Sequence, residues 1–319
     1  PKGHIMAINK DFHIRFTKLS SNLDNFNLSL SNPFDGRRHD SFLTDIIREH
    51  LISDVPIATT ISGGIDSSVV SLNVEKYSIK NNMFSAFSES FDSEITDKRL
   101  VEYKDKLINI DCTLTNTSEY VDEIIKKLSA PFESSSWIYQ DILMKEISTN
   151  FKYKVLLVGE GADEVYSGYK RLFYPYLFSL ELGEEKDLLE QSISGFSAFL
   201  GIKKEEILKN YYLFTESLNS KTDYEDQIYS KYFFNNGNDF DYERYFPSFE
   251  QISSNDPEIF YKKHLLSYLN RADIPSTLYV LDIISMSYGI ELRVPFLDIK
   301  LFEEVMNYSF KYHFNRGFN

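Results

Sequence analysis

A serine- and glycine-rich string at residues 61–68, ISGGIDSS, joins a buried strand pattern to a helix pattern. Gly63 and Gly64 let the backbone turn tightly and approach an anion without a clash at Cβ. The following helix presents its first N–H groups and the positive end of its dipole to that anion. The spacing matches neither the Gly-x4-Gly-Lys-Ser/Thr loop nor the Gly-x-Gly-x-x-Gly loop. We therefore predict a phosphate-binding loop of another type, with Asp66 as a ligand of the cation that a carboxylate beside phosphates requires.

A second glycine-rich string is acidic. It reads VGEGADEVYSGY at residues 158–169 and follows a short, wholly apolar strand pattern at 155–158. Loops at the carboxyl ends of parallel strands share one crevice. We therefore expect the two strings to face one ligand, with Asp66 and Asp163 holding a Mg²⁺ ion that neutralises a pyrophosphate leaving group. Alone, such a string is typical of a solvated loop, and its place beside the first string favours a site.

The elements that must position these strings alternate between strand and helix patterns. Apolar runs predict strands at 55–61, 84–88, 107–114 and 155–158. Helical spacing predicts helices at 41–51 (capped by Asp40 or Ser41), 67–80, 95–106, 121–128 and 137–149. Such alternation predicts an α/β fold, with a doubly wound, mostly parallel sheet covered on both faces.

The two ends of the chain have a different character. Residues 1–6 are interpreted as a tag remnant, and residues 7–40 as an irregular lead-in. The sheet-forming core occupies 41–169, and a helical part follows at 170–319. In that part we predict helices at 257–270 and 276–288, the second with Ser276 as N-cap and Gly289 just after its end.

The composition excludes several classes of protein. The net charge is −14 and the pI about 5.0, which argues against a protein that binds a nucleic-acid backbone. The single cysteine, Cys112, excludes a disulfide within the chain and a cysteine-based metal site. No apolar run approaches the roughly 18–20 residues of a membrane span, so we expect a cytoplasmic protein without a membrane partner.

Three strings together resemble a known family. The first is similar to the Ser-Gly-Gly-x-Asp-Ser loop of the ATP pyrophosphatases, which cut ATP between its α and β phosphates. The second resembles the asparagine synthetase signature Gly-Glu-Gly-Ser/Ala-Asp-Glu-Val-Phe-Gly-Gly-Tyr, and LDIISMSYGIELRVPFLD at 281–298 is similar to a third signature of that family. The resemblance spans 41–310 but is weak at 170–265. It implies the synthetase domain of the asparagine synthetase family, whose relatives include β-lactam and lasso-peptide lactam synthetases.

The resemblance implies roles for individual residues. It makes 41–169 the ATP-binding core and gives the helical part a share in the acyl-substrate site. It implies Asp66 and Asp163 as Mg²⁺ ligands, and Glu160 as the base that takes a proton from the attacking nitrogen. The implied ATP-binding residues are Ile61, Ser62, Gly63, Gly64, Asp66, Ser67, Ser68, Glu89, Val158 and Gly159.

The chain also departs from the family pattern. Ile283 stands where the family has an arginine, so either a guanidinium is missing near the acyl site or this position packs in the core. Arg293 is kept, and an ion pair with Glu291 or Asp298 is favoured over a ligand contact. The serines at 134–136 either line the acyl pocket or cap the helix that follows.

Two parts of the family's machinery have no counterpart in the sequence. The family's glutaminase nucleophile is its first cysteine, whereas Cys112 lies mid-chain beside a predicted strand and is expected to be a buried thiol. The family also carries a catalytic lysine in a helical segment beyond the 281–298 string, and we expect that lysine to be absent from these 319 residues, whether it is cut away, disordered or supplied otherwise. We therefore expect a separate glutaminase or a C-terminal partner to complete the reaction.

The sequence thus predicts an amide-forming ligase. With ATP and Mg²⁺ it would activate a small-molecule or peptide carboxylate as an acyl-adenylate, for attack by ammonia or an amine. Glu160 favours asparagine-synthetase-like chemistry, because the β-lactam synthetases place a tyrosine there. An intramolecular or peptide-cyclising lactam synthetase, and a non-catalytic homologue acting as a partner subunit, remain alternatives. The acid itself stays open.

Overall fold

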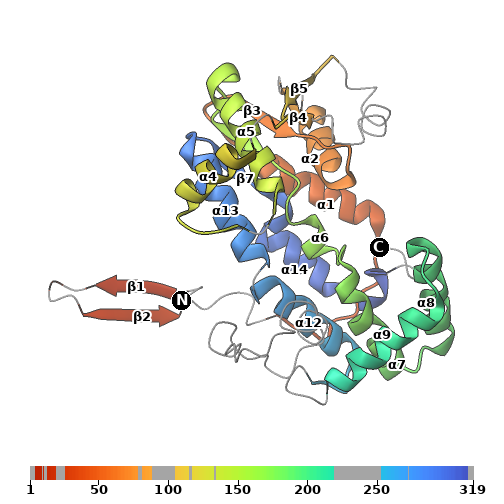
Figure 1. Ribbon diagram of the computed structural model, residues 1–319. Helices are drawn as coiled ribbons and strands as arrows, with labels where there is room; N and C mark the ends of the chain where they lie inside the picture. Colours follow the sequence, from red (N-terminus) through yellow and green to blue (C-terminus); the bar gives the residue numbers. More distant parts are fainter. Residues whose placement is uncertain are drawn as a thin grey trace.

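A five-stranded parallel sheet forms the centre of the computed structural model (Figure 1). The structure describes residues 4–8, 10, 13–18, 26–77, 81–87, 105–114, 117–132, 134–218, 253–271 and 273–314. The strand order is β5-β4-β3-β6-β7, and every neighbouring pair is parallel. The strands are β3 (Ile57–Thr60), β4 (Met83–Phe87), β5 (Leu107–Asp111), β6 (Val155–Leu157) and β7 (Glu291–Arg293). The predicted α/β fold with a parallel sheet is therefore confirmed.

The two central strands bury both of their faces. Ile57 of β3 and Val155 of β6 are paired and belong to one hydrophobic core, whereas the next pair, Ala58 and Leu156, belongs to a second core. Because successive side chains of a strand point to opposite faces, this alternation places one core on each side of the sheet. A strand covered on both faces must be apolar throughout, which is why these strands appear as short, unbroken apolar runs.

Helices from separate parts of the chain cover the two faces. The first core includes residues of α1 (Gly36–Glu49) and α2 (Ile65–Lys76). The second core includes residues of α4 (Thr117–Leu128), α5 (Ser136–Glu146) and α13 (Asp273–Ser287). The sheet is thus wound on both sides, as predicted.

The helical part continues the first core without a break. Five helices of this part contribute residues to the first core: α7 (Phe173–Leu182), α8 (Lys186–Leu200), α9 (Lys204–Ser217), α12 (Pro257–Arg271) and α14 (Ile299–Asn307). In Figure 1, α7, α8, α9 and α12 gather at the end of the molecule opposite β4 and β5. Among the described residues, no helix is both long and apolar enough to cross a membrane.

The sheet has a topological switch point between β3 and β6. From β3 the chain moves to β4 and β5 on one side, and it later returns to β6 and β7 on the other. Ligands of open α/β sheets bind at such a point, outside the carboxyl ends of the strands. The loops that leave β3 and β6 there are the two glycine-rich strings.

Some boundaries differ from the sequence-based predictions. Helix α1 begins at Gly36, and its cap is Asp35, whose carboxylate accepts from the amides of Arg37 and Arg38 at 3.0 and 3.2 Å. The prediction of Asp40 or Ser41 as cap was wrong, because the polar first turn of α1 adds nothing to the apolar periodicity. Gly289 does end α13 in the left-handed region, with φ of 64°.

Helix α13 also starts earlier than predicted. It begins at Asp273, so Pro275 lies within its first turn and Ser276 is not its cap. Proline is tolerated there, because the first N–H groups of a helix have no intrahelical partner. The helix predicted at 137–149 ends as α5 at Glu146 and continues as a π-helical turn at Ile147–Phe151.

Two strand regions also differ from the predictions, and one predicted helix lies almost entirely outside the described residues. The lead-in is not wholly irregular, because β1 (His4–Ile8) and β2 (Ile14–Lys18) form an antiparallel hairpin. Its second strand, IRFTK, alternates apolar and polar residues as strands do. Strand β7 was not predicted. The predicted helix at 95–106 lies almost entirely outside the described residues, of which only 105 and 106 belong to it.

Candidate active site

The first loop is held in a fixed turn by its own serines. Gly63 has a φ of 74°, a left-handed conformation that favours glycine. The Ser62 amide donates to Ser67 Oγ at 3.0 Å, and the two hydroxyls lie 3.1 Å apart. Gly64 is the N-cap of α2, with φ −75° and ψ 161°, which any residue can adopt. The turn itself therefore needs glycine only at Gly63.

The loop leads directly into a helix N-terminus suited to an anion. The first intrahelical hydrogen bond of α2 runs from the Ser68 amide to Gly64 O at 3.2 Å. The amides of Ile65, Asp66 and Ser67 precede it and point out of the helix end. Ser68 Oγ donates to Gly64 O at 2.6 Å, so this hydroxyl serves the helix. Backbone amides, with the Ser62 and Ser67 hydroxyls, make this a ready anion site.

The second loop packs against the same helix end. A Cβ at Gly159 would lie 2.6 Å from the Ser67 nitrogen and 2.8 Å from the Asp66 carbonyl carbon. Only glycine permits this backbone approach. Gly161 has a φ of 97°, and a Cβ there would lie 2.4 Å from the Leu297 side chain. The two glycine-rich strings, about 90 residues apart in the chain, thus form one continuous surface.

Four carboxyl groups gather at this surface. Burial, followed by the charges of Asp163 and Glu164, raises the pKa of Asp66 to about 6. Burial, followed by the charges of Glu164, Asp66 and Asp163, raises the pKa of Glu160. Each effect has a common physical cause, since a carboxylate near other carboxylates and away from water is costly to ionise. The cluster is therefore short of positive charge.

The donor set fits a magnesium ion that shares its ligands with a substrate. Carboxylate oxygens are hard ligands of the kind that Mg²⁺ prefers, and the ion usually takes one or two of them plus phosphate oxygens. Over the described ranges, no group of three or more His, Cys, Asp or Glu side chains is arranged to hold an ion alone. Asp66 and the exposed Asp163 suit such a shared ion, with phosphates supplying the other oxygens.

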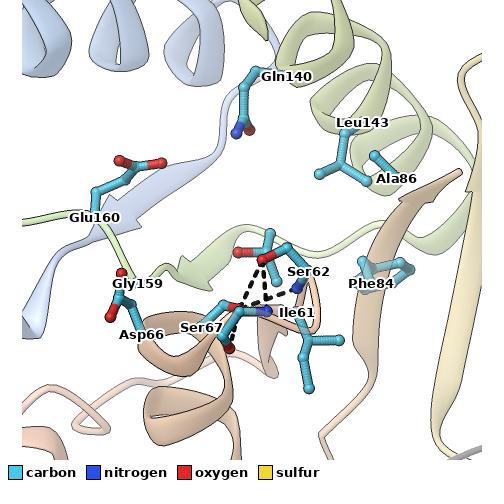
Figure 2. Close-up of a pocket in the computed structure, with 12 residues that line it drawn as sticks. Ile61, Ser62, Asp66, Ser67, Phe84, Ala86, Gln140, Leu143, Gly159 and Glu160 are labelled. Atoms are coloured by element: carbon cyan, nitrogen blue, oxygen red, sulfur yellow. Dashed lines mark hydrogen bonds between the residues drawn. The ribbon is translucent and has the colours of Figure 1, made fainter. Parts of the chain in front are cut away.

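A pocket opens between the two loops and α5 (Figure 2). Its volume is about 230 Å³, somewhat below the ~300–1,000 Å³ usual for small-molecule sites, and it is open to solvent on one side. In Figure 2, Gln140 and Glu160 lie across the space from Ser62 and Ser67, with Leu143, Ala86 and Phe84 at the other end. The lining residues are Thr60, Ile61, Ser62, Gly64, Asp66, Ser67, Phe84, Ala86, Gln140, Leu143, Gly159 and Glu160.

Most residues of the predicted site meet in this pocket. Those outside its lining are Gly63, Ser68, Val158 and Asp163. Val158 is buried and donates its amide to Arg293 O at 3.1 Å. The predicted adenine contact at Glu89 lies outside the described residues.

The sequence did not predict that α5 lines the pocket, on the side called here the roof. Gln140 and Leu143 lie three residues apart on α5, so they occupy one helix face. That spacing is visible in the sequence, but whether this helix face points into the pocket depends on how α5 packs against β4. Thr60 is the last residue of β3, and Phe84 and Ala86 belong to β4; all three lie within the strands predicted at 55–61 and 84–88, although they were not named as site residues.

The departures from the family pattern have structural explanations. Ile283 packs against the second core. Arg293 Nε donates to Glu291 at 2.8 Å, and its Nη1 donates to the carbonyls of His50 and Ile52 at 2.6 and 2.8 Å. Of the two predicted ion-pair partners, Glu291 is therefore the one used. The arginine fastens the end of α1 to the sheet.

Local contacts bear on two other predictions. Ser134 Oγ accepts from the Ser136 amide at 3.2 Å, so this hydroxyl helps to cap α5. The pocket lining contains none of the serines at 134–136. Cys112 is a fully buried thiol of the second core, as expected.

Comparison with known proteins agrees with the geometry. A stretch of 170 residues, 47% of this chain, is 27% identical to glutamine-hydrolyzing asparagine synthetase B of Escherichia coli (strain K12). The match covers 29% of that protein, so the chain corresponds to less than a third of its length. The family model described as asparagine synthase matches residues 39–319, far more than half of the chain. With both signature loops in one pocket at the switch point of the sheet, the chain belongs to the asparagine synthase family.

Proposed function

We propose that this chain is the synthetase part of an ATP-dependent ligase that forms an amide through an acyl-adenylate. The observation that carries the proposal is the contact between the two loops. Gly159 lies against the first turn of α2, so Glu160 and the serine loop border one pocket. A phosphate site, a carboxylate cluster and an apolar end meet there, which is the set of surfaces that a nucleotide triphosphate requires.

Different residues of the chain would bind the phosphates, the nucleoside and the Mg²⁺ ion of ATP. The amides at the start of α2, with the hydroxyls of Ser62 and Ser67, would hold the phosphates. Phe84 and Leu143 are apolar, and their end of the pocket suits the nucleoside. Asp66 and Asp163 would hold Mg²⁺. That ion supplies positive charge, which neutralises the pyrophosphate as it leaves.

The proposed reaction has two balanced steps. A carboxylate oxygen of the substrate attacks the α-phosphorus, and the bond to the β-phosphate breaks, so that pyrophosphate leaves. Ammonia or an amine then attacks the acyl carbon, the amide bond forms, and AMP leaves with the oxygen that joined it to the acyl group. The proton lost by the nitrogen passes to Glu160.

Glu160 suits that proton transfer. A general base works best when its pKa lies near the operating pH. Burial and the neighbouring carboxylates raise the pKa of Glu160 from its ordinary value toward that range. The raised pKa also keeps its conjugate acid stable after the proton has arrived.

Acid-dependent exchange of labelled pyrophosphate into ATP tests the proposal. The chain is incubated with ATP, Mg²⁺, labelled pyrophosphate and one candidate carboxylic acid at a time, starting with aspartate and short peptides. We expect exchange with at least one acid and none without acid. Binding of ATP without exchange for any acid, even with a C-terminal partner or extension supplied, would favour the non-catalytic homologue instead.

A further inference from the structure

The segment that follows the acidic turn contains an unusual backbone conformation. Ser167 is fully buried and has a φ of 65°. A side chain in this left-handed region crowds the backbone, so the conformation is strained for serine. Strain of this kind persists only when the surroundings hold the residue in place. The contacts of Ser167 therefore show what holds the turn.

Two buried side chains hold the Ser167 hydroxyl. Tyr261 of α12 donates to Ser167 Oγ at 2.8 Å, and Ser167 Oγ lies 2.9 Å from His313 Nδ1. Burial, with the charge of Lys262, lowers the pKa of His313 to about 3, so its ring is neutral at ordinary pH. Because Tyr261 already donates to the serine, the serine can donate its own hydrogen to Nδ1. The result is a one-way chain from Tyr261 through Ser167 to His313.

The two residues after Ser167, Gly168 and Tyr169, contact the acidic turn directly. The Gly168 amide donates to Asp163 O at 2.7 Å. A Cβ at Gly168 would lie only 1.9 Å from Asp163 Oδ1, so the carboxylate lies directly against this glycine. The next residue, Tyr169, donates to Glu164 Oε1 at 2.9 Å. A change in the turn at Ser167 would therefore displace Gly168 and Tyr169, and with them the contacts that hold Asp163 and Glu164.

We propose that Ser167 is a positioning residue: the hydroxyl chain from Tyr261 to His313 holds the left-handed turn that sets Asp163 and Glu164 beside Asp66. The inference rests on the proposed function, because Asp163 and Asp66 are assigned there to Mg²⁺. It concerns a residue that touches neither ligand and acts through the backbone of Gly168.

Two substitutions at Ser167 separate conformation from side-chain size. Ser167→Ala keeps the crowded Cβ and removes the hydroxyl that holds it. Ser167→Gly removes the hydroxyl and the crowding together, and glycine adopts this φ without strain. ATP binding to the full chain is measured by calorimetry at increasing Mg²⁺. For Ser167→Ala we expect the half-saturating Mg²⁺ concentration to rise about fivefold or more, and for Ser167→Gly to stay within about twofold of the parent.

A pair of tyrosine substitutions supplies a matched control. Tyr261→Phe removes the donor to Ser167, and we expect a shift of about two- to threefold in the same direction. Tyr176 is equally buried, and it donates instead to Phe314 O at 2.9 Å. Tyr176→Phe deletes a comparable hydrogen bond and should leave the Mg²⁺ requirement unchanged. An equal shift in both variants would overturn the proposal.

The relative Mg²⁺ requirements of Ser167→Ala and Ser167→Gly distinguish the positioning role from a packing role. Alanine is closer to serine in size, so a packing role would make Ser167→Gly the worse variant, and that order contradicts the proposal. So does a parental Mg²⁺ requirement in Ser167→Ala.

Hydrogen exchange of the amides at 160–168, measured without ATP, tests the positioning role of Ser167 separately from the proposed function. Faster exchange in Ser167→Ala but not in Ser167→Gly supports the positioning role, even if the parent binds ATP independently of Mg²⁺. Parental exchange in Ser167→Ala overturns it.

Discussion

The proposed phosphate loop contains two neighbouring glycines, Gly63 and Gly64. We expect them to serve different purposes, and Gly64→Ala tests the purpose of the second. The backbone at Gly64 suits any residue, and an added Cβ would meet only Ser62 Oγ within 4 Å, at 3.3 Å. That hydroxyl can rotate, so the folding cost is small, about 0.5–1 kcal/mol, which is the difference between alanine and glycine at an N-cap. The free energy of unfolding should hardly change.

The same methyl group would stand where a phosphate must approach the α2 amides. Each hydrogen bond to a charged group is worth about 1.5–3 kcal/mol, and about 1.4 kcal/mol is tenfold in affinity. Loss of one such bond therefore weakens ATP binding by about 10- to 100-fold. Gly64→Val places two more methyl groups there and should abolish binding. Calorimetry with ATP and Mg²⁺ measures the affinity, and urea unfolding measures the stability.

Gly201, between α8 and α9, provides the opposite control. Its φ is 67°, and a Cβ there would meet no atom within 4 Å. Gly201→Ala thus introduces strain of about 1–2 kcal/mol without a clash, and it should lower stability while leaving ATP affinity unchanged. Parental ATP affinity in a folded Gly64→Ala variant would refute the assignment of this loop to phosphate.

Three further predictions concern the pocket. Glu160→Gln keeps the shape and removes the base, so amide formation should fall about 10²–10⁴-fold while ATP affinity stays near parental; an unchanged rate would exclude the role. The pKa of Asp66 lies above its ordinary value, so the folded chain binds this proton more tightly than the unfolded chain, and ionisation destabilises the fold as the pH rises from about 4 through about 6. Asp66→Asn should therefore raise the Tm of the metal-free chain at pH 7 but not at pH 4, and it should remove the Mg²⁺ dependence of ATP binding. Gln140→Leu keeps the size of the pocket roof and removes its amide, so nucleotide affinity should fall about 3- to 10-fold if a hydrogen bond is lost; Leu143→Met, on the same helix face, is the control that should not change it.

The parts of the site that depend on local structure could be predicted from the sequence. A short apolar strand, two glycines and a helix start are neighbours in the chain, and the turn at Gly63 follows from them. The two loops were also expected to lie at one crevice, since parallel strands end at the same edge of a sheet, although the contact of Gly159 with α2 was not foreseen. Wholly apolar strand runs indicated burial on both faces and hence the doubly wound fold.

The remaining features depend on contacts between distant segments. Strand β7 has only three residues, Glu-Leu-Arg, and becomes a strand because β6 offers it an edge. Gln140 reaches the pocket because of the way α5 crosses the sheet. The hydroxyl chain through Ser167 joins α12 to the last described residues, and no pattern within any one of those segments indicates it.

The bond at which ATP is cleaved is the most direct test of the proposed chemistry. ATP labelled at the α-phosphate is incubated with the chain, Mg²⁺, ammonia and the acid that supports exchange, with a C-terminal partner added if one is needed for turnover. The labelled product is then separated. We predict labelled AMP, with one pyrophosphate released for each amide formed. Labelled ADP in a fixed ratio to the amide would contradict adenylation.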